Sequence, residues 1–588
     1  MGIFFGKYLV YLFIMNILKI ILPLIFCFWY HGIYSQLTHP RAWAEWEETD
    51  GVIIHQPNFY LQEQPTPVEL LIAEEWDSLY ADLIRGLFDE GVNIYYILDT
   101  NDRPEYHSDI IDTMYLKYDI DIHHPGFHTV IGCKDNYTKL TKWTRDHGPM
   151  NVFKNETDSL YFYLFSDDAK GAGAVMRDYL GIPDTVFYQG GAGNIGSDGG
   201  NYIVDGHAVG IVNMGNGAVL PALKSFFGLD TVYALANYLE HADYYLKMVD
   251  EETLIISSHH PDDYIYGSEP YTYSQDSAIL SGLVAFFQEQ VVSQYGRPMK
   301  VFSVPNPPSV CDDSLQLWWY THYASYTNSL IVNRSVFVPQ FDTPGHDSTA
   351  LAIYRQAMPG YRIVPVFSSR GATAGGGVHC LTNSVAASDP VLIRHYCLND
   401  TVDVAAGYDI TATIMAAAGI SEAFVNWSSD PLGPFQSVLM EKDSGDAYSG
   451  LIPYQTGMTE VYYYITAVSE KGRSGIKPMV APDHTFHFTI RGGAPGWISQ
   501  AEQAGGIVRI YPNPARNLVR IDLSEARLDF SSAMDLRIYD LLGNRIMAGI
   551  TGGEKEFSVS LEHLAAGQYF VVVQDLKGRF VSEKLLIF

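Results

Sequence analysis

A strand, an amphipathic helix and a second strand follow one another repeatedly between residues 52 and 367 of this 588-residue chain. The first copy has an apolar strand at 52–55, a helix around 69–87 and a strand at 92–97. Two further copies occupy residues 254–302 and 330–366. In each copy the hydrophobic period changes from two residues to 3.6, which marks a strand–helix–strand unit. The pattern predicts the α/β class for this part of the chain.

The helical pattern stops near residue 398, and two all-β parts are expected after it. Residues 399–490 contain short alternating strands, such as 408–413 and 461–466, with the spacing of an immunoglobulin-like sandwich. We expect this sandwich to be a spacer or a stabilising appendage. Residues 491–506 open with Arg-Gly-Gly-Ala-Pro-Gly and are predicted to be a linker. Residues 507–588 are predicted to form a second all-β domain.

The N-terminus has the features of an export signal. An apolar run occupies residues 8–30; Lys7 precedes it and Lys19 lies within it. Read from Met15, a short charged start and an apolar stretch lead to Ser35, a small residue at a plausible cleavage point. We therefore expect residues 1–35 to be a signal peptide, with Met15 as the true start. The alternative is an uncleaved membrane anchor, because the apolar run could just span a bilayer. Lys19 at its centre argues against that alternative.

Composition narrows the classes of partner. The chain has 67 acidic and 37 basic residues, a formal net charge of −30. Such a charge disfavours nucleic acid and anionic membrane surfaces, and it tolerates cationic substrates. We expect no metal site, because histidines such as His128 and His259 lack ligand spacing and are interpreted as loop residues. Once the signal is removed, no stable membrane span is expected.

Four cysteines would remain in the exported chain: Cys133, Cys311, Cys380 and Cys397. Export permits disulfides, and four cysteines could form two. If Cys380 must stay a thiol, at most one bridge can form among the other three.

Cys380 lies in the run Gly-Gly-Gly-Val-His-Cys-Leu-Thr at residues 375–382. A thiol becomes a good nucleophile when a histidine or a cation favours its ionised form. His241 in another segment could be the histidine that favours the ionised thiol. Asp243 in the same segment and Asp146 in a third could bind the substrate, because two aspartates in one pocket would bind a guanidinium. Each residue also has a structural alternative. Cys380 could be a buried hydrophobe, Asp146 a turn former, and the other two a solvated strand face, since their period-two spacing on an extended segment aims both at one face.

As a set, five segments resemble the agmatine deiminase and porphyromonad-type peptidylarginine deiminase family of the pentein superfamily. These segments are residues 143–149, 197–201, 241–243, 326–330 and 375–382. The resemblance runs from about Trp43 to about Tyr396. It implies that residues 36–398 form a pentein α/β propeller, five ββαβ units around a pseudo-fivefold axis.

The resemblance also implies catalytic roles. Cys380 would attack the guanidinium carbon and form a covalent thiouronium intermediate. His241 would protonate the departing ammonia and then activate water, while Asp146 and Asp243 would hold the guanidinium. No cofactor is implied, because the charge of the electrophile already activates it. The expected substrate-binding residues are Trp143, which would pack on the alkyl stem or guanidinium face, Asn328, which would orient the thiol or substrate, and Asp198 in the second matching segment.

One departure from the family pattern concerns specificity. In the porphyromonad-type enzyme, arginines after the next strand bind the carboxylate of a C-terminal arginine. Here the strand at 160–165 is followed by Ser166, Asp167 and Asp168, without arginine. Acidic residues there would suit the amine of agmatine or an internal arginine, so we count Asp167 and Asp168 as candidate substrate-binding residues. They could equally form a solvated turn.

The end of the chain resembles the type A C-terminal sorting domain that the type IX secretion system reads. The sequence Tyr-Pro-Asn-Pro stands at 511–514, and a strand of the pattern LxxGxYxVxV follows near the end. This resemblance implies export across two membranes, removal of the domain, and release or attachment at the cell surface. An unrelated β-sandwich is the alternative.

The prediction is thus a secreted guanidino-group deiminase that acts on arginine-containing peptides or proteins and yields citrulline and ammonia. Agmatine, converted to N-carbamoylputrescine on a route to putrescine, is the alternative substrate. Two other readings stay open. The same arrangement of residues could support another reaction of the superfamily, such as amidino transfer. Alternatively, the chain could be a catalytically silent surface adhesin.

Overall fold

The computed structural model describes most of the chain after residue 38. The described residues are 39–55, 67–98, 104–132, 144–165, 172–187, 202–204, 209–213, 220–235, 242–259, 273–307, 324–368, 377–402, 407–455, 459–491, 506–530, 534–540, 545–561, 564–575 and 579–588. The predicted signal peptide and most of the predicted linker lie outside these residues. Among the helices described, none has both the length and the hydropathy that crossing a membrane requires.

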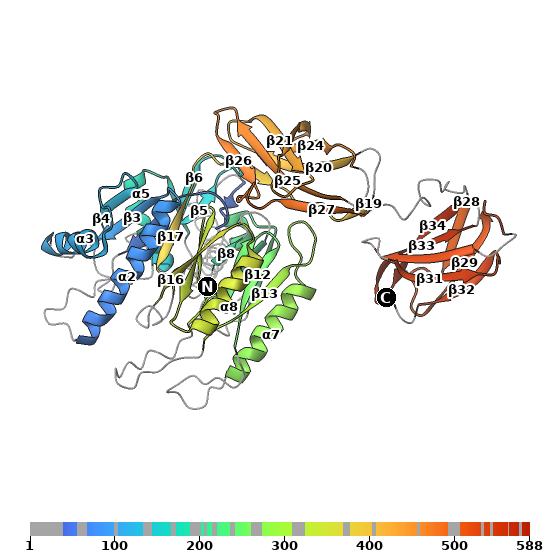
Figure 1. Cartoon of the computed structure of the whole chain (residues 1–588), viewed down its shortest axis with the longest axis horizontal. Coiled ribbons are helices and arrows are strands. Elements are labelled where there is room, and N and C mark those ends of the chain that lie inside the picture. The colour runs from blue at the N-terminus through green and yellow to red at the C-terminus, as the bar shows by residue number, and fades with distance from the viewer. Residues whose placement is uncertain are drawn as a thin grey trace, which may run out of the picture. The chain divides into compact units, whose positions relative to one another are not determined.

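Five sheets in the described part of residues 41–386 share one topology, in which an antiparallel pair is followed by a helix and a parallel strand (Figure 1). One of them has the order β17-β2-β3-β4, and α2 and α3 connect its parallel strands. Its elements are β17 (Thr382–Ala386), β2 (Thr49–His55), α2 (Pro67–Asp89), β3 (Asn93–Leu98), α3 (Pro104–Tyr118) and β4 (Phe127–Ile131). Since β17 pairs with β2, this sheet brings the two ends of the α/β part together.

The other four sheets follow in chain order. The second has β1 (Arg41–Ala42), β5 (Met150–Phe153), β6 (Leu160–Phe165), α5 (Ala172–Leu180) and β7 (Asp184–Phe187). The third has β8 (Tyr202–Val204), β9 (Val209–Asn213), α6 (Leu220–Phe227) and β10 (Thr231–Leu235). The fourth has β11 (Leu246–Asp250), β12 (Thr253–Ser258), α7 (Tyr273–Glu289) and β13 (Lys300–Pro305). The fifth has β14 (Leu330–Val332), β15 (Ser335–Gln340), α8 (Pro344–Ala357) and β16 (Arg362–Phe367).

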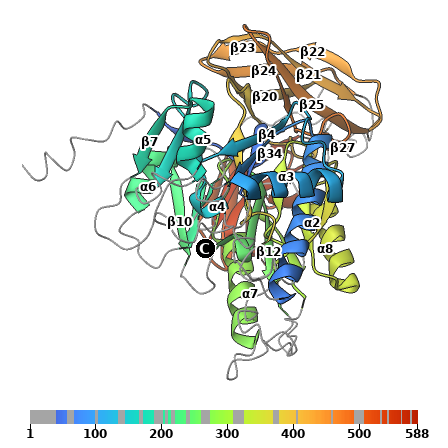
Figure 2. The same ribbon diagram turned by 90° about the vertical axis from the view of Figure 1, so that its left-hand side faces the viewer.

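Helices α2 and α8 pack between neighbouring sheets, which agrees with the near-continuous burial of β2, β3, β14 and β15 (Figure 2). Helix α2 contacts its own β3 and also β16 of the fifth sheet, while α8 contacts β13 of the fourth. Trp76, Tyr80 and Leu83 of α2 are almost fully buried in one core with Ile94 of β3 and Phe337 of β15. A strand covered on both faces has a continuous apolar sequence, and such apolar runs were the basis on which these strands were predicted.

In the described part of residues 392–491 the regular elements are all strands, as predicted. One sheet has the order β18-β20-β24-β23, and β21 pairs with both β22 and β25 in another. The elements are β18 (Leu392–Arg394), β19 (Thr401–Val402), β20 (Tyr408–Met415), β21 (Ile420–Ser428), β22 (Gln436–Leu439), β23 (Glu441–Ser444), β24 (Ala447–Ile452), β25 (Thr459–Ser469), β26 (Ser474–Lys477) and β27 (Phe486–Arg491). Strand β25 alternates strictly between buried and partly exposed positions along most of its length.

Among the described C-terminal residues, from 506 onwards, the regular elements are also all strands, and these strands have their own core. The sheet orders are β28-β29-β32 and β31-β30-β33-β34. The strands are β28 (Gly506–Tyr511), β29 (Leu518–Ala526), β30 (Met534–Asp540), β31 (Arg545–Thr551), β32 (Glu556–Ser560), β33 (Gly567–Gln574) and β34 (Phe580–Ile587). Val519, Ile521 and Leu523 alternate along β29 and are fully buried with Ile538 and Leu585. Backbone contacts assign residues 487–588 to a compact unit that excludes residues 1–396.

Candidate active site

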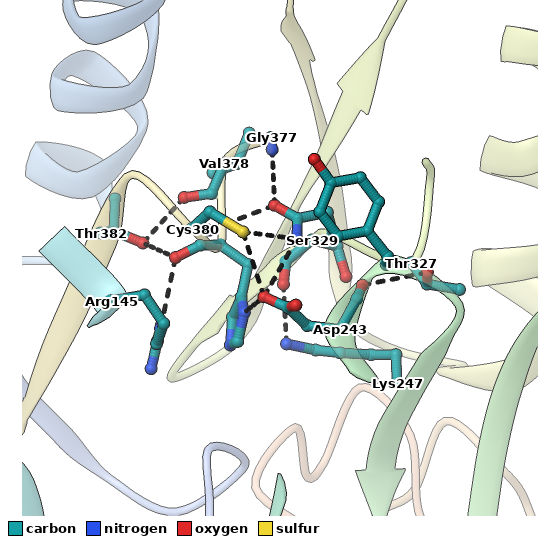
Figure 3. A network of polar contacts seen from close by, with 12 residues as sticks. Arg145, Asp243, Lys247, Thr327, Ser329, Gly377, Val378, Cys380 and Thr382 are labelled. Carbon is teal, nitrogen blue, oxygen red and sulfur yellow. Dashed lines mark hydrogen bonds and ion pairs between the residues drawn. The ribbon is translucent and has the colours of Figure 1, made fainter. Parts of the chain in front are cut away.

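Cys380 is buried immediately before β17, with 2% of its surface exposed. Its Sγ donates to Oδ2 of Asp243 at 3.2 Å and accepts from Nδ2 of Asn328 at 3.0 Å (Figure 3). Asn328 Nδ2 also donates to the same Asp243 oxygen at 3.0 Å. The thiol, the carboxylate and the amide thus form a closed triangle, although residues 243, 328 and 380 are far apart in the sequence.

Asn328 also holds the backbone that carries the cysteine. Its Oδ1 accepts from the backbone N–H of Gly377 at 2.7 Å and from that of Cys380 at 3.1 Å. A Cβ at residue 377 would lie 3.1 Å from this oxygen and 3.3 Å from the backbone oxygen of Asn328. A larger residue would therefore push the two segments apart, which explains the glycine at position 377.

Asp243 is fully buried in the 3₁₀ helix η5 (Ala242–Tyr244), at 0% exposure. The expectation of an extended segment at 241–243 was therefore wrong. The backbone N–H of Tyr245 donates to the carbonyl oxygen of Ala242 at 3.1 Å, and this bond closes a turn where alternation had suggested a strand. The turn directs Asp243 at Cys380 just before β11 begins.

His379, next to the cysteine, lies between two carboxylates. Its Nδ1 is 2.7 Å from Oδ2 of Asp243, and its Nε2 is 3.0 Å from Oε2 of Glu45. Glu45 Oε1 accepts from Lys247 Nζ and from the backbone N–H of Ile331, both at 2.7 Å. A chain of hydrogen-bonded groups therefore runs from Lys247 through Glu45 and His379 to Asp243.

The charges in this chain stabilise one another. Burial raises the pKa of Glu45, but Lys247 and His379 outweigh burial and hold that pKa well below its usual value. Burial lowers the pKa of Lys247, and the Glu45 carboxylate opposes this shift. Lys247 Nζ donates to Ser329 O at 2.7 Å as well as to Glu45. Because each group hydrogen-bonds to the other and to the backbone, we assign Glu45 as a carboxylate and Lys247 as an ammonium.

Arg145 is the second buried cation here. Its backbone N–H donates to Cys380 O at 3.0 Å, and its Nε donates to His379 O at 3.2 Å. Both bonds fix the segment that carries the thiol. Arg145, Glu45, Asp243, Lys247 and His379 line a cavity of about 70 Å³. The remaining lining residues are Ala42, Trp43, Trp46, Pro149, Met150, Asn151, Met248 and Asn383.

The described residues test only part of the predicted site. Cys380, Asp243 and Asn328 come together. The predicted residues outside the described ranges are His241, Trp143, Asp198, Asp167 and Asp168. Asp146 belongs to the short helix α4 (Thr144–His147), but its side chain is also outside what is described.

Sequence reasoning gave no role to Glu45, Lys247, Arg145 or His379. His379 could have been noted because it adjoins Cys380 in the matching run. Glu45 and Lys247 carry no local signal, because only tertiary contacts join residues 202 positions apart. Within the described ranges, no group of three or more histidine, cysteine, aspartate or glutamate residues is arranged to hold a metal ion.

Residues 41–385, more than half of the chain, match the model of the Porphyromonas-type peptidyl-arginine deiminase family. The chain belongs to this family. A protein of Vibrio parahaemolyticus is 42% identical over 64 residues, 11% of this chain and 18% of that protein. The agmatine deiminase of Ectopseudomonas mendocina is 41% identical over 63 residues, 11% of this chain and 17% of its own length. These matches therefore span less than a fifth of each curated relative.

Solved structures of deiminases align with a larger share of this family member. The agmatine deiminase of C. jejuni covers 59% of this chain and 95% of its own, with 16% identity and a TM-score of 0.43. That of Enterococcus faecalis gives the same coverage, identity and score. Residues 509–588 match a secretion system C-terminal sorting domain, which indicates secretion or the cell surface.

Proposed function

We propose that this family member is an exported guanidino-group deiminase that converts peptidyl-arginine to citrulline and ammonia. One observation carries the proposal: Cys380 Sγ lies 3.2 Å from a fully buried carboxylate, Asp243, and 3.0 Å from the amide of Asn328. A buried carboxylate beside a thiol suits a cationic electrophile, because its negative charge would attract a guanidinium in a site where water screens the charge little.

The proposed reaction has two steps. The Cys380 sulfur attacks the guanidinium carbon, the C–N bond to one NH₂ group breaks, and the thiol proton leaves with that nitrogen as ammonia. His241 is proposed to carry this proton. Water then attacks the thiouronium carbon, again with His241 as the base, and the C–S bond breaks to give the ureido product and the free thiol. Proton transfer of this kind is worth roughly 10²–10⁴ in rate.

Asp243 and Asp146 are proposed to hold the guanidinium nitrogens, which keeps the carbon in line with the sulfur. Asn328 Nδ2 is a donor to the sulfur at 3.0 Å and would stabilise the thiolate as the proton leaves. Trp143 is proposed to pack on the substrate stem, and Asp198 to lie at the substrate site. The reaction needs no cofactor, because the substrate brings its own positive charge.

Agmatine is the second candidate substrate, and the specific observation behind it is the acidic sequence after β6. Asp167 and Asp168 stand where an arginine-binding member would have arginines, and two carboxylates would favour an amine. The sorting domain favours peptide or protein arginine, since these are the guanidino groups accessible outside the cell. A catalytically silent adhesin is the alternative of another class.

The proposal extends to architecture and targeting. We propose that the five ββαβ sheets surround a pseudo-fivefold axis, as in a pentein propeller spanning 36–398. Residues 399–490 and 507–588 are proposed to be immunoglobulin-like domains joined by a linker at 491–506. Residues 1–35 are proposed to be a signal peptide, and the type IX secretion machinery is the proposed export partner.

The test compares three substrates side by side, an internal-arginine peptide, free arginine and agmatine, with a colorimetric assay for ureido product. Wild type should turn over the peptide fastest. Cys380→Ala should lose all turnover yet keep its folded signal and its affinity for guanidino ligands. Asp243→Asn should lose several orders of magnitude in kcat/KM. Ureido formation by Cys380→Ala, or a change under tenfold in Asp243→Asn, would contradict the mechanism.

A further inference from the structure

The two ring nitrogens of His379 each face a carboxylate oxygen. Nδ1 is 2.7 Å from Asp243 Oδ2 and Nε2 is 3.0 Å from Glu45 Oε2, with His379 4% exposed. A neutral imidazole has one N–H donor and one nitrogen that can only accept. If the ring were neutral, a lone pair would therefore point at one of these two carboxylates.

Neither carboxylate is free to take up the missing proton without disturbing other bonds. Glu45 already accepts from Lys247 Nζ and from the backbone N–H of Ile331. Asp243 Oδ2 already accepts from Cys380 Sγ and Asn328 Nδ2. Two donors reach Oε1 of Glu45 and two more reach Oδ2 of Asp243, which is the environment of an ionised carboxylate. The remaining proton therefore belongs on the ring.

We propose that His379 is a doubly protonated positioning residue, fixed by Glu45, that orients Asp243 and offsets charge at Cys380. This inference deepens the proposed function and rests on it. When Cys380 loses its proton, a thiolate forms 3.2 Å from the Asp243 carboxylate. Two negative groups at that distance repel each other, and the imidazolium donating to Asp243 Oδ2 at 2.7 Å reduces the repulsion.

Glu45 is the anchor of this arrangement. Its Oε2 lies within hydrogen-bond distance of His379 Nε2, the ring nitrogen that faces away from Asp243. Its Oε1 accepts from Lys247 Nζ, which also donates to Ser329 O. The backbone N–H of Ile331 at the start of β14 fixes the same oxygen. The ring therefore cannot rotate away from Asp243 without breaking a buried ion pair. Such support of a site residue by a second layer of hydrogen bonds is typical of pre-organised sites.

The kinetic test uses a matched control on the same segment. Glu47 is also in a partly buried ion pair, with its Oε1 accepting from Arg41 Nη1 at 2.5 Å and from the backbone N–H of Ala44 at 3.1 Å, and neither partner is His379. Glu45→Gln should lower kcat at least about tenfold on an internal-arginine peptide, with a smaller change in KM. Glu47→Gln should destabilise the fold to a comparable degree and leave kcat within about twofold of wild type. Equal effects of both variants on kcat would overturn the proposal.

A pair of substitutions at His379 separates positioning from packing. Asparagine places its amide nitrogen near the position of imidazole Nδ1, so His379→Asn retains a donor to Asp243. Glutamine is closer to histidine in volume, but His379→Gln places its amide near Nε2, towards Glu45. The proposal predicts that His379→Asn is the more active of the two, whereas a packing role predicts the opposite order. Glu45→Gln combined with His379→Asn should cost no more than the worse single variant, because both act through one relay. Additive losses would contradict the relay.

The protonation state is measured without substrate. In the full chain labelled with ¹⁵N-histidine, one ring should carry protons on both nitrogens at neutral pH, and its signals should vanish in His379→Asn. A singly protonated His379 ring would overturn the proposal even if the enzyme is active. If wild type deiminates no guanidino compound, the proposed function fails, while the ring measurement still decides whether His379 is charged.

Discussion

Substitution of Asn328 separates two tasks that one side chain performs. Its Oδ1 accepts from two backbone N–H groups, of Gly377 and Cys380, and its Nδ2 donates to Asp243 and to the Cys380 sulfur. Asn328→Ala removes all four bonds. Each buried N–H left without a partner costs about 1–3 kcal/mol, so we expect a loss of about 2–6 kcal/mol of folding stability.

Asn328→Asp keeps the acceptor oxygen for both N–H groups but replaces the donor with a second carboxylate oxygen. That oxygen would lie about 3.0 Å from Asp243 Oδ2 and from the sulfur, the distances that the amide nitrogen now has. Two unit charges at this separation repel by about 5 kcal/mol at an effective dielectric of about 20, so the new carboxyl and Asp243 would share a proton near neutral pH. We expect kcat/KM to fall at least about 100-fold, the equivalent of about 3 kcal/mol.

The assay measures kcat/KM for ureido product together with urea unfolding of both variants. The aspartate variant should recover part of its rate as the pH falls, because a protonated carboxyl can donate again. The alanine variant should show no such recovery. Asn328→Asp within threefold of wild type at neutral pH would refute the role of the amide donor, and unchanged stability of Asn328→Ala would refute the role of its oxygen.

Three further predictions concern pH, specificity and processing. Burial lowers the pKa of His395 to about 4 from 6.5, with Nδ1 donating to Thr411 O and Nε2 accepting from the Tyr463 hydroxyl. As the pH falls, the unfolded chain binds a proton at this ring before the folded chain does, so the stability that the neutral ring contributes is complete above pH 6.5 and is lost as the pH falls towards 4. In that window, His395→Gln should reduce the dependence of the unfolding free energy on pH by up to about 1.4 kcal/mol per pH unit, as measured by urea unfolding. An unchanged pH dependence would contradict the assignment. Because Asp167 and Asp168 stand where arginines would bind a C-terminal carboxylate, amidating an arginine peptide should leave kcat/KM unchanged or raise it, and a tenfold preference for the free acid would defeat the idea. Mass spectrometry of the secreted protein should find an N-terminus near Gln36 and no peptides from residues 507–588, whereas recovery of Phe588 would argue against removal of the sorting domain.

The sequence by itself predicted an α/β part followed by all-β parts, and the position of several elements within them. Hydrophobic period is a local property, so the change from two to 3.6 residues predicted α2 around 69–87, and the structure extends it to Pro67–Asp89. The strand predicted at 160–165 is β6 without any shift. In the copy at 330–366, helix α8 starts at Pro344, where a polar first turn carries no hydrophobic pattern that could mark the start in the sequence.

Only the tertiary structure decided how the site is assembled. Asp243 sits in a 3₁₀ turn where alternation suggested a strand, because its burial against Cys380 outweighs local preference. Glu45 meets His379 across 334 positions, and no periodicity can signal a hydrogen bond between such distant residues. The antiparallel pairing of β17 with β2 makes this meeting possible, since it places the cysteine segment beside the start of the α/β part. The motif identified the thiol, and the fold selected the charges that surround it.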